Sequence, residues 1–449
     1  MEEKKIISGF SKLSKTGKIK WIVENFFKDP ESVMKELVSY WHKDHEQQKI
    51  LDGFSENTIS NFPMPYGIAP NFLIDGKTYA IPMVIEESSV VAAAAAGAKF
   101  WMDRGGFKTK VIGTTKVGQV HFQWFGDFEK LKKEEINLFN KLKNDALDLY
   151  TNMEKRGGGI TGIELIDLSH EIKGIYQIKV EFETCDSMGA NFINSILESF
   201  GNSLVAFIEE NDQFKNKAPE IIMCILSNYT PDCIVRAEVS CKIKDLGTFA
   251  NDIDSEEFAS RFNTAVEIAQ VDPYRATTHN KGIFNGIDAV VLATGNDFRA
   301  VEACGHTYAA RSGQYRSLSS CDIKNGQFKF WMDIPLSVGT IGGLTKLHPI
   351  AKRSLELLGH PSASELMSII AAVGLSQNFS AVRSLVTTGI QKGHMKMHLI
   401  NMLYQFNATE KEISEAENYF MDKTPSSSEV RNFIEKMRKF ENIDLFNKK

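Results

Sequence analysis

The alternation of strand-like and helical segments between Val117 and Asn228 constrains the fold of this chain most strongly. The run VGQVHFQWF predicts a strand, and a long, charged, periodic helix is expected from about Phe128 to Arg156. Two strands (ITGIELIDL and GIYQIKVEFE), a helix from about Gly189 to Asn211 and a last strand (EIIMCILSN) follow. This βαββαβ order is typical of a ferredoxin-like unit, an antiparallel sheet with helices on one face, in a chain of the α+β class.

A second segment, Val90 to Asp103, contains five consecutive alanines at Ala92 to Ala96. Alanine is the best helix former, and its small side chain lets neighbouring elements approach closely. We therefore expect a buried central helix with other helices packed around it.

The region after His394 predicts a separate helical unit. Thr409 with Glu412, and Ser426 with Glu429, fit the capping-box pattern, and Pro425 separates the two helices. Helices this polar and charged bury few apolar side chains among themselves. We therefore expect a small terminal unit that can move relative to the rest of the chain.

Composition excludes several classes of function. The formal net charge of the 449 residues is −5, and no basic run suits a phosphate backbone, so nucleic acid is not an expected partner. The apolar run from Val90 to Trp101 is shorter than the roughly 20 residues that span a bilayer, so no membrane anchor is expected. The charged start, MEEKKIISGF, favours the cytoplasm.

Two further patterns resemble cofactor motifs without fitting them. GGGITG at 157–162 satisfies GxGxxG but follows a helix and precedes a strand, the reverse of the Rossmann context. His394 and His398 have helical spacing, but position 395 is Met where HExxH needs Glu. The six cysteines form no CxxC pair, so we expect reduced thiols and no metal site.

The segment from Thr278 to Ala300, THNKGIFNGIDAVVLATGNDFRA, points to an enzyme. It carries Lys281 before a helix-forming stretch and Asp297 in the polar, glycine-rich run TGND. If the two side chains meet in a cleft, their charge pair could stabilise negative charge developing on a substrate oxygen. Isolated charges of this kind are more often solvated surface residues, so this interpretation needs further motifs.

Five further motifs occur in chain order. They are ENTISNFPMPYGIAPNF (56–72), IPMVIEESSVVAAAA (81–95), CDSMGAN (185–191), PLSVGTIGGLTKLHP (335–349) and GLSQNFSAVRSLVTTGIQKGHMKMH (374–398). Together with the Lys281 segment they resemble the class II, soluble form of hydroxymethylglutaryl-CoA (HMG-CoA) reductase over roughly residues 50 to 400.

The resemblance implies a discontinuous large, helical, substrate-binding domain around the central helix, formed by residues 1–112 and 229–392. It also implies an inserted dinucleotide-binding small domain at 113–228 and a C-terminal helical flap at 393–449. Homodimers with sites at the subunit interface are expected from the same resemblance.

The family's reaction is the reductive deacylation of HMG-CoA to mevalonate and coenzyme A, with two hydrides from NADPH or NADH and no metal. The resemblance assigns oxyanion stabilisation to Lys281, with Asp297 as its neighbour and Glu87 as the catalytic acid. It assigns protonation of the coenzyme A thiolate to His394. An alternative role is the same reaction run oxidatively in mevalonate catabolism.

Binding residues also follow from the resemblance. Those expected to bind the cofactor are Asp186, Met188, Gly189 and Asn191. Those expected to bind substrate are Ser89, Arg275, Asn285, Asn228 and Gln377. A guanidinium such as that of Arg275 pairs well with the free carboxylate of the hydroxymethylglutaryl group, whereas asparagines often fill capping or turn positions.

The chain departs from the family pattern at two places. Ser60, Asn61 and Phe62 stand where relatives commonly have a glycine before the first substrate loop. Tyr150 occupies the place of an acidic residue that holds the ribose hydroxyls of NAD in NAD-selecting relatives. The choice between NADH and NADPH therefore stays open.

Overall fold

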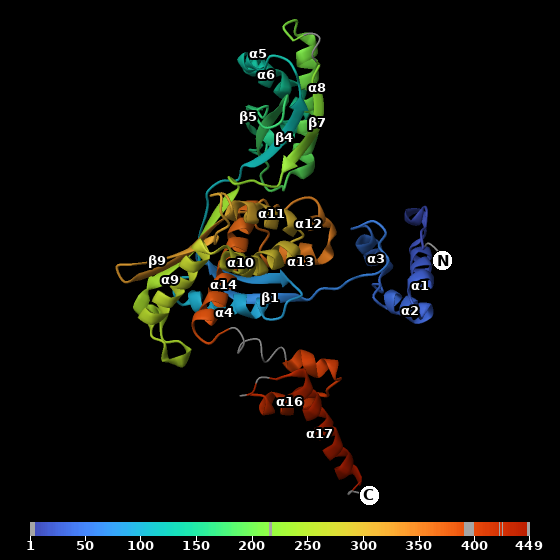
Figure 1. The fold of residues 1–449 in the computed structure, drawn as a ribbon, viewed down its shortest axis with the longest axis vertical. Coiled ribbons are helices and arrows are strands. Elements are labelled where there is room, and N and C mark those ends of the chain that lie inside the picture. The colour runs from blue at the N-terminus through green and yellow to red at the C-terminus, as the bar shows by residue number, and fades with distance from the viewer. Residues whose placement is uncertain (1–4, 215–217, 390–398, 422, 424, 447–449) are drawn as a thin grey trace.

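The computed structural model describes residues 5–214, 218–389, 399–421, 423 and 425–446. A central body lies between a four-stranded sheet unit at one end and the C-terminal helices at the other (Figure 1). The N-terminal helices α1 (Lys15–Phe26), α2 (Pro30–Ser39) and α3 (His45–Asp52) lie to one side of the body.

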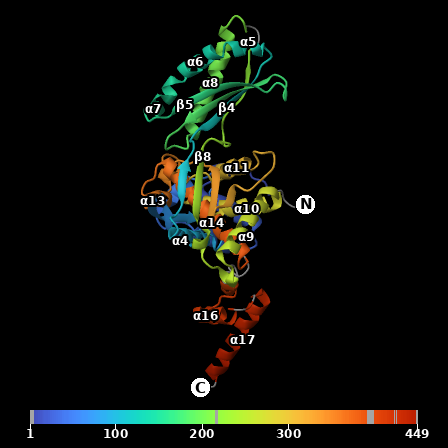
Figure 2. The same ribbon diagram turned by 90° about the vertical axis from the view of Figure 1, so that its left-hand side faces the viewer.

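The sheet unit has the predicted order of strands and helices. Its strands are β4 (Lys116–Gln123), β5 (Gly159–Asp167), β6 (Ile175–Glu183) and β7 (Glu220–Ser227). They form an antiparallel sheet in the order β5-β6-β4-β7. The helix α8 (Ala190–Glu210) and three shorter helices cover one face of this sheet (Figure 2). Gly157 to Gly159 lead directly into β5, in agreement with the rejection of a Rossmann motif.

The prediction of a single helix from Phe128 to Arg156 is wrong. Three helices occupy this stretch: α5 (Phe128–Lys133), α6 (Glu135–Asp145) and α7 (Leu147–Glu154). The breaks fall at Glu134 and Ala146, where ψ is 7° and 3°. Because the chain bends at both residues, apolar side chains from all three helices reach the core of the same sheet, among them Leu131, Leu142 and Tyr150.

The body is assembled from segments on both sides of the sheet unit in the sequence. Its sheet has the order β3-β8-β10-β9, from β3 (Lys108–Val111), β8 (Ile234–Lys242), β10 (Gln327–Pro335) and β9 (Ser319–Lys324). A hairpin of β1 (Tyr66–Ile74) and β2 (Lys77–Val84) packs nearby. The helices are α4 (Val90–Met102), α9 (Ser255–Val271), α10 (Pro273–Ala293), α11 (Phe298–Ala309), α12 (Leu344–Leu347), α13 (Pro349–Leu357) and α14 (Ala363–Val386). One continuous hydrophobic core joins most of these elements.

The alanine-rich segment forms the helix α4, as predicted, and it packs against α14. Only one face of the helix is buried, since Ala92 and Ala96 are exposed. The Ser376 hydroxyl of α14 donates to the Ala94 carbonyl at 2.8 Å, and Ser380 donates to Ala93 at 2.7 Å. The helix α14, which was not predicted, could cross a membrane by length and composition. However, 72% of the apolar stretch of α14 is buried inside the protein, as is typical of a core helix. The helix is therefore weak evidence for a membrane-spanning segment.

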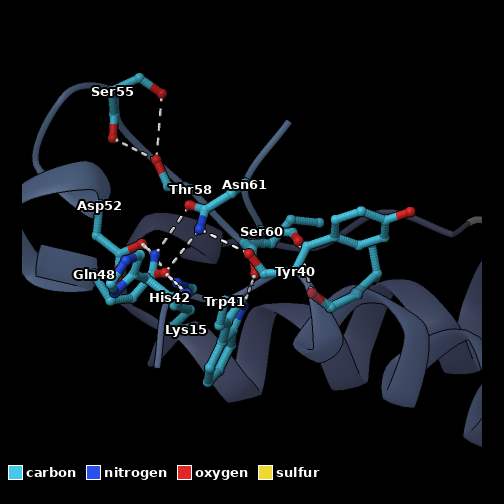
Figure 3. A network of polar contacts seen from close by, with 12 residues as sticks. Lys15, Tyr40, Trp41, His42, Gln48, Asp52, Ser55, Thr58, Ser60 and Asn61 are labelled. Carbon is cyan, nitrogen blue, oxygen red and sulfur yellow. Dashed lines mark hydrogen bonds and ion pairs between the residues drawn. The ribbon is translucent and has the colours of Figure 1, made fainter. Parts of the chain in front are cut away.

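A polar network ties the N-terminal helices to the chain that follows them (Figure 3). Asn61 donates to the Tyr40 carbonyl at 2.8 Å and exchanges hydrogen bonds with the Gln48 amide. The Ser60 hydroxyl donates to the Leu37 carbonyl at 2.6 Å. Ser60 and Asn61 therefore anchor the N-terminal helices, whereas Phe62 is 91% exposed.

The C-terminal helices begin as predicted. Thr409 caps α16 (Glu410–Tyr419) in a capping box with Glu412. Ser426 and Glu429 exchange the equivalent bonds at the start of α17 (Ser427–Phe446). A small cluster that includes Leu403, Phe420, Val430 and Ile434 forms the core of this unit.

Candidate active site

Glu87 and Lys281 come together from distant parts of the chain. The Lys281 ammonium, on α10, donates to Glu87 Oε2 at 2.5 Å across 194 residues of sequence. Glu87 lies between the end of β2 and the start of α4, where Ser89 adopts a positive φ of 74°. The Lys281 side chain is 60% exposed and that of Glu87 38%, so a substrate can reach both.

The helix α10 also carries two of the expected substrate residues. Asn285 follows Lys281 by four positions and therefore lies on the same helix face. The Arg275 side chain is half-buried, which lowers the pKa of its guanidinium from the usual value. Among the residues that the structure describes, no hydrogen bond or ion pair engages Arg275, so its donors are available to a bound anion.

Asp297 has a partner of its own. It caps α11, where its Oδ1 accepts from the Arg299 and Ala300 amides at 3.0 and 3.2 Å. Its Oδ2 also pairs with the Arg299 guanidinium at 2.9 Å. Burial alone would raise the pKa of Asp297, but these hydrogen bonds outweigh it and hold the pKa below its ordinary value. Within the described part of the chain, Lys281 and Asp297 do not pair with each other.

A cavity of about 740 Å³ joins Asp297 to the expected cofactor loop. Met188, Gly189 and Asn191 line it together with residues 295–299, Gly339 and the glycine-rich segment 341–345. A Cβ atom on Gly339 would lie 2.5 Å from the Met188 amide nitrogen, so the two loops pack backbone against backbone. No residue of the run VGTIGG was predicted to form part of the site, although repeated glycines commonly mark such close approaches.

Asp186 is bonded to the body of the protein. Its carboxylate accepts from the Ala363 amide at 2.7 Å, at the start of α14, and its carbonyl accepts from the Thr340 amide at 2.9 Å. Unlike its neighbours, it is absent from the residues that line the cavity. Asp186 therefore fastens the loop of residues 185–191 to the body.

The remaining expected residues are placed as follows. Gln377, on α14, is 4% exposed, and its side-chain oxygen has no hydrogen-bond partner. It packs against Gly286 of α10, where an added Cβ would lie 2.9 Å from Gln377 Cβ. Asn228 borders a pocket of about 10 Å³ beside Met188, which has room for about one water molecule. His394 and His398 lie outside the described residues.

Tyr150 is part of the core of the sheet unit. It is 6% exposed, and its hydroxyl donates to the Lys143 carbonyl at 3.1 Å. Burial, together with the Glu154 carboxylate, raises the pKa of its phenol. Its hydroxyl is thus engaged with the backbone of the same unit.

The chain resembles proteins of one family over most of its length. The family model for hydroxymethylglutaryl-coenzyme A reductase matches residues 20–399. The 3-hydroxy-3-methylglutaryl-coenzyme A reductase of Archaeoglobus fulgidus is 37% identical over 408 residues, which are 91% of this chain and 88% of that protein. A probable reductase of Borreliella burgdorferi is 33% identical over 89% of this chain and 88% of its own length.

A solved structure gives the same result. The class II 3-hydroxy-3-methylglutaryl-CoA reductase from Streptococcus pneumoniae, bound to NADPH in open conformations, superposes with a TM-score of 0.68 at 34% identity. The match covers 92% of this chain and 100% of that one. The mixed α+β fold is therefore similar to that of a class II reductase. The chain belongs to the hydroxymethylglutaryl-coenzyme A reductase family.

Proposed function

We propose that this chain reduces HMG-CoA to mevalonate and free coenzyme A in the mevalonate pathway of isoprenoid biosynthesis. The observation that carries the proposal is the 2.5 Å contact between Lys281 and Glu87. An ammonium held beside a carboxyl group provides both a stabiliser for an alkoxide and a source of its proton. The oxidative, mevalonate-consuming direction would use the same residues.

The reaction consists of two reductions, and in each of them negative charge on the carbonyl oxygen of the substrate must be stabilised. As the thioester carbonyl gains electron density, the Lys281 ammonium donates a hydrogen bond to its oxygen, and Glu87 supplies the proton. Cleavage of the carbon–sulfur bond then releases the coenzyme A thiolate, which we assign His394 to protonate on the resemblance alone. As that bond breaks, the hydroxyl proton returns to Glu87, so the same lysine and glutamate serve the resulting aldehyde in the second reduction. Asp297 borders the cavity where the two reactants would meet.

Binding of the hydroxymethylglutaryl group is assigned to residues around α10. The unengaged guanidinium of Arg275 would pair with the free carboxylate of the substrate. The unpartnered oxygen of Gln377 is a buried acceptor that a substrate hydroxyl could satisfy. Ser89, Asn285 and Asn228 complete the proposed set.

A nicotinamide cofactor, NADPH or NADH, would supply the two hydrides. The cavity beside Met188, Gly189 and Asn191 fits such a group, because these residues lead into the amino terminus of α8, whose free amides favour a pyrophosphate. The buried Tyr150 leaves selection between the two cofactors to other side chains.

We further propose a division into a large domain (1–112 and 229–392), an inserted cofactor domain (113–228) and a C-terminal flap (393–449). Three separate hydrophobic clusters support this division. We also propose a cytoplasmic homodimer. The exposed side chains of Ile268, Val271 and Tyr274, beside Arg275, support a subunit interface next to the site.

The test follows nicotinamide absorbance with the purified chain and HMG-CoA, with NADPH and NADH in parallel. Lys281→Ala should lower kcat by about 100-fold or more, the range for loss of an oxyanion donor. The matched control is Lys329→Ala, which removes a comparable pair with Glu238 on the body sheet. Equal turnover in the two variants would refute the mechanism, and mevalonate oxidation with coenzyme A measures the alternative direction.

A further inference from the structure

Lys116, the first residue of β4, is an unusual lysine. It is 4% exposed, although lysine is almost never fully buried without a charged partner. Its ammonium donates to the Thr184 hydroxyl at 2.6 Å and to the Ser187 carbonyl at 3.4 Å. Within the described part of the chain, no carboxylate pairs with it. A buried charge with only neutral partners is costly, which calls for a compensating role.

The partners of Lys116 belong to the turn that precedes α8. The Thr184 hydroxyl donates to the Ser187 carbonyl at 2.6 Å, and the Ser187 amide donates to the Thr184 carbonyl at 3.0 Å. The Ser187 hydroxyl in turn accepts from the Gly189 amide at 3.1 Å. Lys116 thus lies at the centre of the hydrogen bonds that shape this turn.

The same turn is confined from its other side. Asp186 is bonded to Thr340 and Ala363 of the body, and Gly339 packs on the Met188 amide. At Gly189, where φ is +87°, an added Cβ would lie 2.6 Å from the Thr184 methyl group. The body and the crowding at Gly189 therefore leave this side of the turn little free space.

The charge of Lys116 also has a defined position. Lys116 lines the small pocket that Met188 and Ala190 also line, at the amino terminus of the 21-residue helix α8. That end of a helix carries a partial positive charge and favours anions. A full positive charge held beside it strengthens the attraction in a buried, weakly screened environment.

We propose that Lys116 is a positioning residue for the phosphates of the dinucleotide cofactor. It fixes the 184–187 turn and adds positive charge behind the amides at the start of α8, without taking part in hydride transfer. The inference rests on the proposed function in one respect, namely that the nicotinamide cofactor binds in the cavity beside Met188. Sequence patterns gave no sign of it, because a lysine at the start of a strand usually faces solvent.

The test measures binding of NADPH and NADH to the full chain, by the fluorescence of the reduced nicotinamide, independently of turnover. Lys116→Met should raise the Kd by about tenfold or more, as expected for loss of a hydrogen-bonded charge. The KM for HMG-CoA and the kcat at saturating cofactor should change by no more than about threefold, which is well below the change of about tenfold expected for the Kd of the cofactor. The control is Lys179→Met on β6, a partly exposed lysine of the same sheet that pairs with Glu181.

A second variant covers the case in which Lys116→Met does not fold. Thr184→Val removes the hydroxyl that links Lys116 to Ser187 and keeps the shape of the side chain. It should weaken cofactor binding by itself. Where Lys116→Met does fold, the losses of the two single variants should be less than additive in the double variant. An unchanged Kd in a folded Lys116→Met protein, or in Thr184→Val, overturns the inference. Cofactor binding without turnover of HMG-CoA in the unmodified chain would instead refute the proposed function.

Discussion

Gly97 of α4 lies so close to Ser376 of α14 that a Cβ atom on the glycine would be 2.5 Å from the serine Oγ and 2.7 Å from its carbonyl oxygen. Because one of these atoms belongs to the backbone, a side chain at position 97 must push the two helices apart. Gly97→Ala should therefore destabilise the protein by about 1–3 kcal/mol, the usual cost of overpacking a core.

The control for this substitution lies on α10. Gly282 is also inside a helix, but an added Cβ would meet nothing within 4 Å. Gly282→Ala should leave stability unchanged or raise it by up to about 1 kcal/mol, because alanine is the better helix former. Urea unfolding followed by circular dichroism measures both, and an undiminished midpoint in Gly97→Ala would contradict the close helix packing.

Arg275 should determine affinity for the acyl group of the substrate. Arg275→Met should raise the KM for HMG-CoA by about 10- to 100-fold, because a hydrogen bond to a charged group contributes about 1.5–3 kcal/mol. The KM for the cofactor should stay the same. Arg261→Met, which removes an exposed arginine of α9 paired with Glu257, is the control. An equal increase in the KM for HMG-CoA and in the KM for the cofactor would indicate a general structural defect and contradict recognition of the substrate carboxylate by Arg275.

The C-terminal unit should loosen in acid because of Glu412. This carboxylate is buried, and its hydrogen bond from Arg438 lowers its pKa from 4.5 to about 2. A depressed carboxyl pKa stabilises the fold above the unfolded value, so this stability should be lost as the pH falls from about 4.5 towards 2. Arg438→Met should abolish most of this pH dependence and cost about 1–3 kcal/mol at neutral pH.

Hydrogen exchange of residues 399–421 at several pH values in the intact chain measures this effect. Lys439→Met, which removes an exposed cation farther along α17, is the control and should exchange like the unmodified chain. Faster exchange in Lys439→Met than in Arg438→Met would contradict the assignment to the Glu412 pair.

The sequence predicted those parts of the molecule that local patterns specify. Alternating and periodic runs located the strands β4 to β7, and short side-chain patterns located the starts of α16 and α17. The family motifs named both Glu87 and Lys281, although only the fold brings them within 2.5 Å of each other. Each of these features depends on residues close together in the sequence or on a recognisable motif.

The features that could not be predicted depend on tertiary packing. The bends at Glu134 and Ala146 separate three short helices whose apolar side chains share one core with the sheet. Asp186 resembles a cofactor ligand in its motif, but its carboxylate is bonded to an amide 177 positions away. The pairing of Asp297 with Arg299, rather than with Lys281, likewise follows from the capping geometry of α11.

His279 should make the body less stable in mild acid. It is 1% exposed on α10, and burial together with the nearby Arg275 guanidinium lowers its pKa from 6.5 to about 3. Its Nε2 lies 2.6 Å from the Ser319 hydroxyl. The unfolded chain therefore binds a proton between pH 6.5 and 3 that the folded chain does not, so stability falls as the pH drops through this window. The midpoint of thermal unfolding should therefore depend less on pH between pH 7 and 4 in His279→Gln than in the unmodified chain. The control His45→Gln, which replaces an exposed histidine, should behave like the unmodified chain. The same pH dependence of the midpoint in all three proteins would contradict a neutral, buried His279.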